Sequence, residues 1–248
     1  MALPLTPIDD LASTLQLSDH ELVSIVGGGG KTTTLFALGE QLPGRVVLTT
    51  TTKMGSERDE GVPVLIRPTD DELARHLETT PRALVWSDRT GHRADGVPPT
   101  DCDRWFQSGV ADHVVVEADG SRRKPFKAPY PYEPVIAQQT TTLIACIGAH
   151  ALGQPIATSC HRVDAVLDIV GGSGDDPLTP AAAAQVLLSD SGSRKGLPAA
   201  ARFVVLVHQV DADNDALAAE LVAAIEDAVP VYCIAKLGGD EHRQKARG

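Results

Sequence analysis

Cysteine is scarce in this chain, and its cysteines lie far apart. The four are Cys102, Cys146, Cys160 and Cys233, with no Cys-x-x-Cys pair among them. This spacing excludes the dense disulfide framework of small secreted domains and a compact zinc knuckle. We therefore expect reduced, partly buried thiols.

Positive charge and long apolar runs are also in short supply. With 22 Lys and Arg against 33 Asp and Glu, the net charge is -11 and the isoelectric point about 5.1, which disfavours nucleic acid and anionic membranes as partners. No run approaches the roughly 20 apolar residues that span a membrane. Residues 1–10 lack the basic head and apolar stretch of a secretory signal. We expect a cytoplasmic protein with neither nucleic acid nor a membrane as partner.

The chain does have enough apolar residues, 42% of 248, for a substantial core. Apolar runs separated by turn residues alternate with segments of helical spacing, which favours an α/β fold with a mostly parallel sheet. The expected strands are 21–26, 45–50, 62–67, 83–86, 113–117, 142–147, 202–207 and 229–234. The expected helices are 31–41, 69–78, 179–188 and 212–228, with Thr69 and Asp211 as candidate caps.

Three segments lack these patterns. Residues 87–101 and 118–139 are predicted to be long loops, which in a compact α/β domain often carry function. Residues 190–199 are predicted to be an exposed connector. We expect a single domain over residues 1–248, with an N-terminal extension at 1–20 and a flexible tail at 238–248.

The strongest local signal is a glycine loop between a predicted buried strand and a predicted helix. It consists of Gly27, Gly28, Gly29 and Gly30, followed by Lys31, Thr32 and Thr33. Glycines let consecutive amides turn towards a phosphate, and the helix that follows adds the positive end of its dipole. Lys31 would neutralise phosphate charge and Thr32 would offer its hydroxyl to Mg²⁺, as in P-loop proteins.

The match to the standard P-loop pattern is incomplete, because Ile25 stands where that pattern has its first glycine. A shortened loop would account for the difference. One alternative is a flexible linker, and another is a glycine turn in a dinucleotide site. A dinucleotide site would have no use for Lys31 and Thr32 together, so phosphate binding is the favoured interpretation.

Two acids, Glu117 and Asp119, follow the apolar run 113–116. In P-loop NTPases an acid at such a strand end holds Mg²⁺, and a further acid can orient the attacking water. Either residue suits either role, and acids at strand ends also occur as plain turn residues. Joined to the glycine loop, they predict a metal site made by Thr32 with Glu117 or Asp119.

Two other strand ends carry polar residues. The run from Thr49 to Lys53 has an ordinary interpretation in β propensity and turn capping. Because carboxyl ends of parallel strands share one edge of a sheet, we expect Thr51, Thr52 and Lys53 to contact metal, phosphate or substrate. Asp211 stands where guanine-reading NTPases carry an aspartate, but its usual partners are absent, so both ATP and GTP stay open.

The loop after Asp119 reverses the acidic charge of the chain. Ser121, Arg122, Arg123, Lys124 and Lys127 lie within this short segment. The cations are predicted to attract the nucleotide γ-phosphate or a phosphorylated substrate, since arginine fits phosphate with two parallel hydrogen bonds. The alternative is a solvated loop that pairs with neighbouring acids.

The block from Glu117 to Ile136, Glu-Ala-Asp-Gly-Ser-Arg-Arg-Lys-Pro-Phe-Lys-Ala-Pro-Tyr-Pro-Tyr-Glu-Pro-Val-Ile, resembles the signature of the YqeC family of selenium-dependent hydroxylase accessory proteins. The segments 26–34, 49–54, 148–156 and 160–163 also resemble blocks of that family, in the same order. The resemblance spans about residues 23–211. It implies a P-loop NTPase fold and an accessory role in maturing molybdenum hydroxylases or their selenium-bearing cofactor.

His161 and Arg162 lie beside one of these blocks and are predicted to contact substrate or to form part of a switch. A lone histidine is more often structural than catalytic. A metal held by Cys160 and His161 would need a third ligand, which the sequence does not supply. Mg²⁺ is the expected metal.

Together these features predict a three-layer P-loop NTPase-like domain that binds Mg²⁺ with ATP or GTP and hydrolyses the triphosphate slowly. Its partner, implied by the resemblance, is a molybdenum hydroxylase or a cofactor-carrying protein. The expected catalytic residues are Lys31, Glu117, Asp119 and Arg122, and Lys31→Ala is expected to abolish triphosphate binding in a protein that stays folded. The alternatives are a small-molecule kinase of the P-loop class and a nucleotide-gated binding module without significant turnover.

Overall fold

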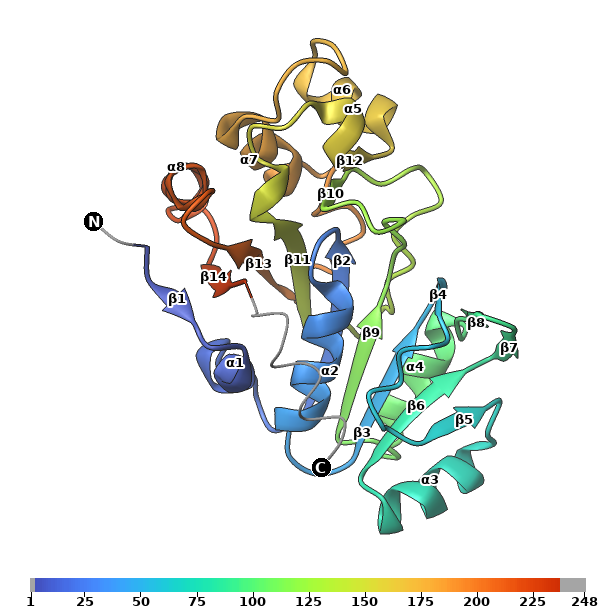
Figure 1. Cartoon of the computed structure of the whole chain (residues 1–248). Coiled ribbons are helices and arrows are strands. Elements are labelled where there is room, and N and C mark those ends of the chain that lie inside the picture. Colours follow the sequence, from blue (N-terminus) through green and yellow to red (C-terminus); the bar gives the residue numbers. More distant parts are fainter. Residues whose placement is uncertain (1–2, 237–248) are drawn as a thin grey trace.

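The computed structural model describes residues 3–236 and has an α/β architecture (Figure 1). The tail expected at 238–248 lies outside the described residues. Within the described part of the chain, nine strands form one sheet in the order β1-β14-β13-β11-β2-β9-β3-β6-β5. These strands are β1 (Leu5–Thr6), β2 (Glu21–Gly27), β3 (Val46–Thr50), β5 (Val64–Ile66), β6 (Arg82–Trp86), β9 (His113–Glu117), β11 (Thr142–Gly148), β13 (Arg202–Val210) and β14 (Val231–Ala235). Every pairing in this sheet is parallel, which confirms the predicted parallel sheet.

The strands predicted from apolar runs are all present, with small shifts at their ends. In β2, β9 and β11 every residue is buried, as expected for central strands with helices on both faces. The N-terminal segment is part of the same sheet, because Leu5 and Thr6 pair with the last strand. Residues Leu11 and Leu15, which follow, are fully buried.

Helices pack on both faces of the sheet. They are α1 (Leu11–Thr14), α2 (Lys31–Gln41), α3 (Asp70–Thr79), α4 (Pro99–Gln107), α5 (Ile156–Ser159), α6 (Val163–Val170), α7 (Pro180–Leu188) and α8 (Asp215–Ile225). Val23 and Ile25 of β2 share a core cluster with α1 and α2. Leu22 and Val26, which point to the opposite face, belong to the cluster that contains α3, α4, α7 and α8. The two clusters give the three layers that the sequence predicts.

The helix starts follow local rules only in part. Thr69 caps α3 with a complete capping box, because its hydroxyl accepts from the Glu72 amide while the Glu72 carboxylate accepts from the Thr69 amide. The second predicted cap was wrong. Asn214, not Asp211, precedes α8, and Asp211 instead accepts hydrogen bonds from the Asp213 amide and the Asn214 side chain.

The expected loop at 87–101 was also wrong. It contains β7 (Asp88–Thr90) and β8 (Arg93–Asp95), which form a small antiparallel sheet with β4 (Lys53–Gly55), and it runs into α4. Only Ala94 in this hairpin is buried, so the strands are held by backbone pairing rather than by an apolar pattern that the sequence could display.

The second expected loop, 118–139, is irregular except for β10 (Phe126–Lys127). This short strand pairs in parallel with β12 (Cys160–His161). Figure 1 shows the β10–β12 pair together with α5, α6 and α7 beyond the carboxyl ends of the central strands. The loop is therefore packed between the sheet edge and this upper group of helices.

All four cysteines are free and buried, as expected for structural thiols. Burial raises the pKa of the Cys146 thiol to about 12 and that of Cys233 to about 11. None of the helices among residues 3–236 has the length and hydrophobicity that crossing a membrane requires.

Candidate functional site at the carboxyl edge of the sheet

The glycine loop joins β2 to α2 at the middle of the sheet and is closely surrounded by backbone. A Cβ added at Gly28 would lie 2.5 Å from the Lys124 carbonyl oxygen and 2.8 Å from the Phe126 amide nitrogen. At Gly30, where φ is 122°, a Cβ would collide with the ring of His208. These contacts require glycine, so the loop is a packed structure and not a flexible linker.

The helix after the loop begins at Lys31 without a side-chain cap. The first amides of a helix have no carbonyl partner within the helix. They also carry the positive end of the helix dipole. The start of α2 therefore directs hydrogen-bond donors and partial positive charge towards the carboxyl edge of the sheet.

Lys31 is only 4% exposed, and its ammonium group lies among oxygen atoms. Nζ donates to the Gly27 carbonyl at 2.6 Å and lies 3.3 Å from Asp119 Oδ1 and 3.7 Å from Glu117 Oε1. Burial alone would lower the pKa of Lys31, but the charges of Asp119 and Glu117 outweigh it and raise that pKa. The lysine is charged.

Glu117 and Asp119 both reach the glycine loop, as the register of β2 and β9 predicts. Ile25 pairs with Glu117 across the two strands. The Thr32 hydroxyl donates to Glu117 Oε2 at 3.0 Å, and the Gly27 amide donates to Asp119 Oδ2 at 3.1 Å. Burial raises the pKa of Glu117, and the Lys31 charge and the Thr32 hydrogen bond partly oppose this. Thr33 follows in the first turn of α2 and is partly exposed.

The ion pairs continue beyond Asp119. Lys127 Nζ lies 3.2 Å from Asp119 Oδ2 and also contacts Glu133 Oε2, and Glu133 Oε1 accepts from Arg162 Nη2 at 3.1 Å. We call this series the ion chain; its members are Glu117, Lys31, Asp119, Lys127, Glu133 and Arg162. Signs alternate along it, and its charges cancel. It connects the glycine loop to the strand pair β10–β12.

The loop after Asp119, which we call the basic loop, does not have its cations arranged as the expected anion-attracting cluster. Lys127 is 1% exposed and also donates to the Gly120 carbonyl at 2.8 Å, so its charge balances internal acids. Lys124 Nζ donates to the Thr158 carbonyl, and Ser121 accepts the Lys124 amide through its carbonyl. Arg122 and Arg123 are exposed.

The other predicted site residues lie around this edge with partners of their own. The Thr51 hydroxyl donates to the Val135 carbonyl at 2.6 Å, and Thr52 accepts the Gly96 amide through its carbonyl. Lys53 is 3.5 Å from Asp95 in the small antiparallel sheet. At the end of β13, Asp211 Oδ2 accepts from Lys236 Nζ at 2.8 Å.

His161 and Arg162 are brought to the same region by β12, in which His161 pairs with Lys127 of β10. Burial, followed by the nearby charges of Arg162 and Lys127, lowers the pKa of His161, and Glu133 opposes this. The sequence reasoning missed Glu133, although the residue lies inside the block used for the family resemblance. Lys127 ends β10 and Glu133 lies in the irregular segment that follows, so no helical or strand period relates the two residues and no pattern predicted the pair.

His208 is a second residue whose role was not predicted from the sequence. It is 3% exposed, and its Nε2 lies 2.9 Å from the hydroxyl of Thr34 in the first turn of α2. Burial lowers the pKa of His208 to about 4. The neutral imidazole of His208 therefore packs against the glycine loop at Gly30.

Acid should weaken the fold through His208. An unfolded histidine with a pKa of about 6.5 takes up a proton before the buried one does, so stability is lost as the pH falls from about 6.5 to about 4. Between pH 7.5 and pH 5 this contribution amounts to about 2 kcal/mol. Urea unfolding of wild type and His208→Gln at pH 7.5 and pH 5 tests this contribution. Between these pH values the free energy of unfolding of the variant should fall by about 2 kcal/mol less than that of wild type. Equal losses in both proteins would contradict this role.

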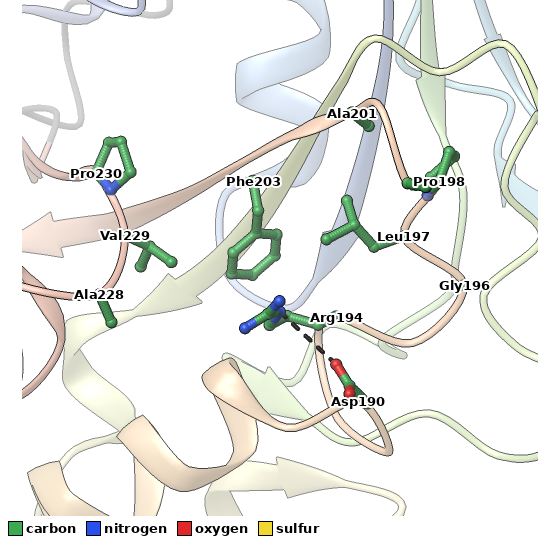
Figure 2. A pocket seen from close by; sticks show the side chains of 11 residues that line it. Asp190, Arg194, Gly196, Leu197, Pro198, Ala201, Phe203, Ala228, Val229 and Pro230 are labelled. Atoms are coloured by element: carbon green, nitrogen blue, oxygen red, sulfur yellow. Dashed lines mark ion pairs between the residues drawn. The ribbon is translucent and has the colours of Figure 1, made fainter.

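A cavity of about 620 Å³ lies at the opposite edge of the sheet. It is bordered by the connector after α7 and by the amino ends of β13 and β14, and Figure 2 shows Phe203 and Arg194 on its wall with the Asp190–Arg194 ion pair. None of the predicted site residues lines it. Among residues 3–236, no group of three or more His, Cys, Asp and Glu side chains is arranged to hold a metal ion.

These features define a parallel α/β protein with a compact charged site where a glycine loop meets the carboxyl end of the neighbouring strand. A family model described as YqeC protein matches residues 23–164. A relative from Escherichia coli (strain K12), named Uncharacterized protein YqeC, is 32% identical over 205 residues, which is 79% of each chain. The chain belongs to the YqeC family, as the resemblance in the sequence indicated.

Proposed function

We propose that this YqeC family member is a P-loop NTPase-like protein that binds a nucleoside triphosphate with Mg²⁺ and hydrolyses it slowly. The observation that carries the proposal is the position of Lys31. A charged lysine follows a packed glycine loop, begins an uncapped helix and contacts both acids of the neighbouring strand end. Polyphosphate is the ligand that such a combination of amides, ammonium and acids suits.

The residues beside Lys31 fit Mg²⁺. This ion prefers oxygen ligands and is usually held by one or two protein groups together with water and phosphate. The Thr32 hydroxyl and the Glu117 carboxylate are already 3.0 Å apart, so they are the groups that would hold it. The bound ion would neutralise charge that develops on the transferred phosphoryl group.

Binding of Mg²⁺ would replace Lys31 as the counterion of Glu117. Lys31 now balances Glu117 and Asp119, and with Mg²⁺ at Glu117 its ammonium would be released to contact the phosphates. Asp119 would keep the Gly27 amide and Lys127 as partners. In the proposed site Asp119 would hold the glycine loop and orient an attacking water, while Glu117 would hold the metal.

The cellular role that we propose is that of an accessory factor in the maturation of molybdenum hydroxylases or of their selenium- or molybdenum-containing cofactor. This role is the one that the resemblance of the sequence blocks implies. Nucleotide hydrolysis would then gate a transfer step between this protein and its client.

The direct test is a thermal shift screen with ATP, GTP and CTP, each with and without Mg²⁺. A ligand present at 100 times its Kd stabilises a native protein by about 2.7 kcal/mol, which raises the Tm by several degrees. We expect such a rise for at least one triphosphate, dependent on Mg²⁺, and slow release of inorganic phosphate from it.

The outcomes separate the alternatives. Binding without phosphate release, also in the presence of a molybdenum hydroxylase, would favour the nucleotide-gated binding module. A phosphorylated metabolite in place of free phosphate would favour the small-molecule kinase. Absence of any shift with all three triphosphates would contradict the proposal.

A further inference from the structure

A second group of side chains with unused binding capacity lies at the outer end of the ion chain. It consists of Tyr130, Tyr132, His161 and Arg162, together with Arg122, whose charge acts on His161, and we call it the Arg162 surface. The Arg162 guanidinium lies 4.0 Å from the centroid of the Tyr130 ring and 5.7 Å from that of Tyr132. The two tyrosine rings meet edge to face, with centroids 5.9 Å apart.

Hydrogen-bonding capacity remains on this surface. Arg162 Nη2 donates to the Tyr132 hydroxyl at 3.0 Å and to Glu133 at 3.1 Å, while its buried Nε has no hydrogen-bond partner. An arginine has five N–H donors, so most of its donors are unused. Arg122 is exposed, and in the described part of the chain it makes no hydrogen bond or ion pair.

The aromatic part of this surface is also open. Tyr132 is 65% exposed, while its hydroxyl accepts a hydrogen bond from Arg162. Exposed aromatic faces next to guanidinium groups are suited to stacking on planar rings.

We propose that the Arg162 surface binds a small molecule in which an anionic group, phosphate or carboxylate, is attached to a planar ring. Arg122 and the free donors of Arg162 hold the anion, and Tyr132 stacks on the ring. His161 interacts electrostatically with Arg162 and Arg122, and its imidazole supplies a further hydrogen bond.

The location makes this ligand a second substrate or cargo, an assignment that rests on the proposed triphosphate site. Arg162 is joined to Lys31 through Glu133, Lys127 and Asp119. An anion at Arg162 competes with Glu133 for the guanidinium, which changes the charge balance along the whole ion chain. Ligand binding at the two ends is therefore coupled, and the coupling is reciprocal.

The probe for this site is phenyl phosphate, compared with inorganic phosphate and phenol by isothermal titration calorimetry. We expect phenyl phosphate to bind at least tenfold more tightly than either fragment. Tyr132→Leu and Arg122→Gln should each weaken it about fivefold, the size of one stacking contact or one exposed charge-assisted contact. Neither substitution removes a member of the ion chain, so both variants should fold as the wild type does.

Arg123→Gln is the matched control. Arg123 adjoins Arg122 in the sequence and is also exposed, but its guanidinium lies 3.9 Å from Glu57. The control should bind phenyl phosphate as the wild type does. If Arg123→Gln and Arg122→Gln weakened phenyl phosphate binding equally, only the net charge of the loop would matter, and the proposal would be overturned.

Two more variants locate the probe. Asp164 is held by the Tyr130 hydroxyl at 2.7 and 2.9 Å, so Asp164→Asn removes a negative charge beside the surface and should tighten binding. Lys31→Met should still bind phenyl phosphate below the lowered Tm of that variant, with the affinity changed only through the ion chain. Loss of binding in Lys31→Met but not in Tyr132→Leu would place the probe in the glycine loop and overturn the site. Failure of triphosphate binding in the wild type would remove the proposed function and leave this result unaffected.

Discussion

Replacing Lys31 by methionine should weaken binding of the preferred triphosphate about 100-fold. The ammonium is the one side-chain cation at the start of α2, and a buried charge-assisted contact to phosphate is worth about 2 to 5 kcal/mol when one partner is removed. Calorimetric titration with the triphosphate that gives the largest thermal shift measures the effect. The matched control is Arg75→Met on α3, whose guanidinium donates to the Asp71 carbonyl and which removes the same charge far from the glycine loop.

The structure adds a cost that the sequence did not predict. Lys31 also neutralises Glu117 and Asp119, so its loss leaves these acids without their shared counterion, and the ligand-free protein should unfold at a lower temperature. Affinity must therefore be measured below the Tm of the variant. A folded Lys31→Met protein that binds the triphosphate as the wild type does would contradict the proposed site.

Much of the sheet and of the inner site was predictable from local pattern. The continuous apolar runs of β2, β9 and β13 are typical of buried strands, and parallel strands bring their carboxyl ends to one edge. This rule accounts for the contact of the Thr32 hydroxyl with Glu117 Oε2 at 3.0 Å, two residues expected from the sequence at one metal site. The rule holds because strand pairing fixes the relative positions of residues that are far apart in sequence, as the pairing of Ile25 with Glu117 illustrates.

The outer half of the ion chain was not predictable by such rules. Glu133 lies in an irregular loop, and Arg162 reaches it only because two-residue strands pair residues that are far apart in sequence. Pairs of this kind leave no periodic signal. The basic loop shows the same limit, since the sequence displays the charge of Lys127 but not the burial that directs this charge to internal acids.

Of all the proposed substitutions, Lys127→Met should cause the largest decrease in the free energy of unfolding. It leaves Asp119 and Glu133 short of a partner in a site where the lysine is 1% exposed. Removing one member of a buried ion pair costs about 3 to 5 kcal/mol, because the remaining charge stays desolvated. Urea unfolding of the ligand-free protein at pH 7 measures this loss.

The pH dependence of this loss follows from Glu133. Burial alone would raise the pKa of Glu133, but Lys127 and Arg162 outweigh it and hold that pKa below its usual range. A carboxyl with a lowered pKa stabilises the fold at neutral pH and loses that effect as the pH falls. Lys127→Met gives up part of this stabilisation, so its deficit relative to wild type should shrink as the pH falls from about 5 to about 3. Adding Glu133→Gln should recover part of it at pH 7, because one of the unpaired charges is gone.

The same variant decides between the two interpretations of the basic loop. A lysine that served only to attract ligand anions would be exposed, and its removal would change stability by no more than about 0.5 kcal/mol while lowering anion affinity. A lysine inside the ion chain has the opposite signature, a large loss of stability in the absence of any ligand. Because Lys127 lies between the acid at the glycine loop and the acid at Arg162, its stability effect also tests whether the two ends form one electrostatic unit.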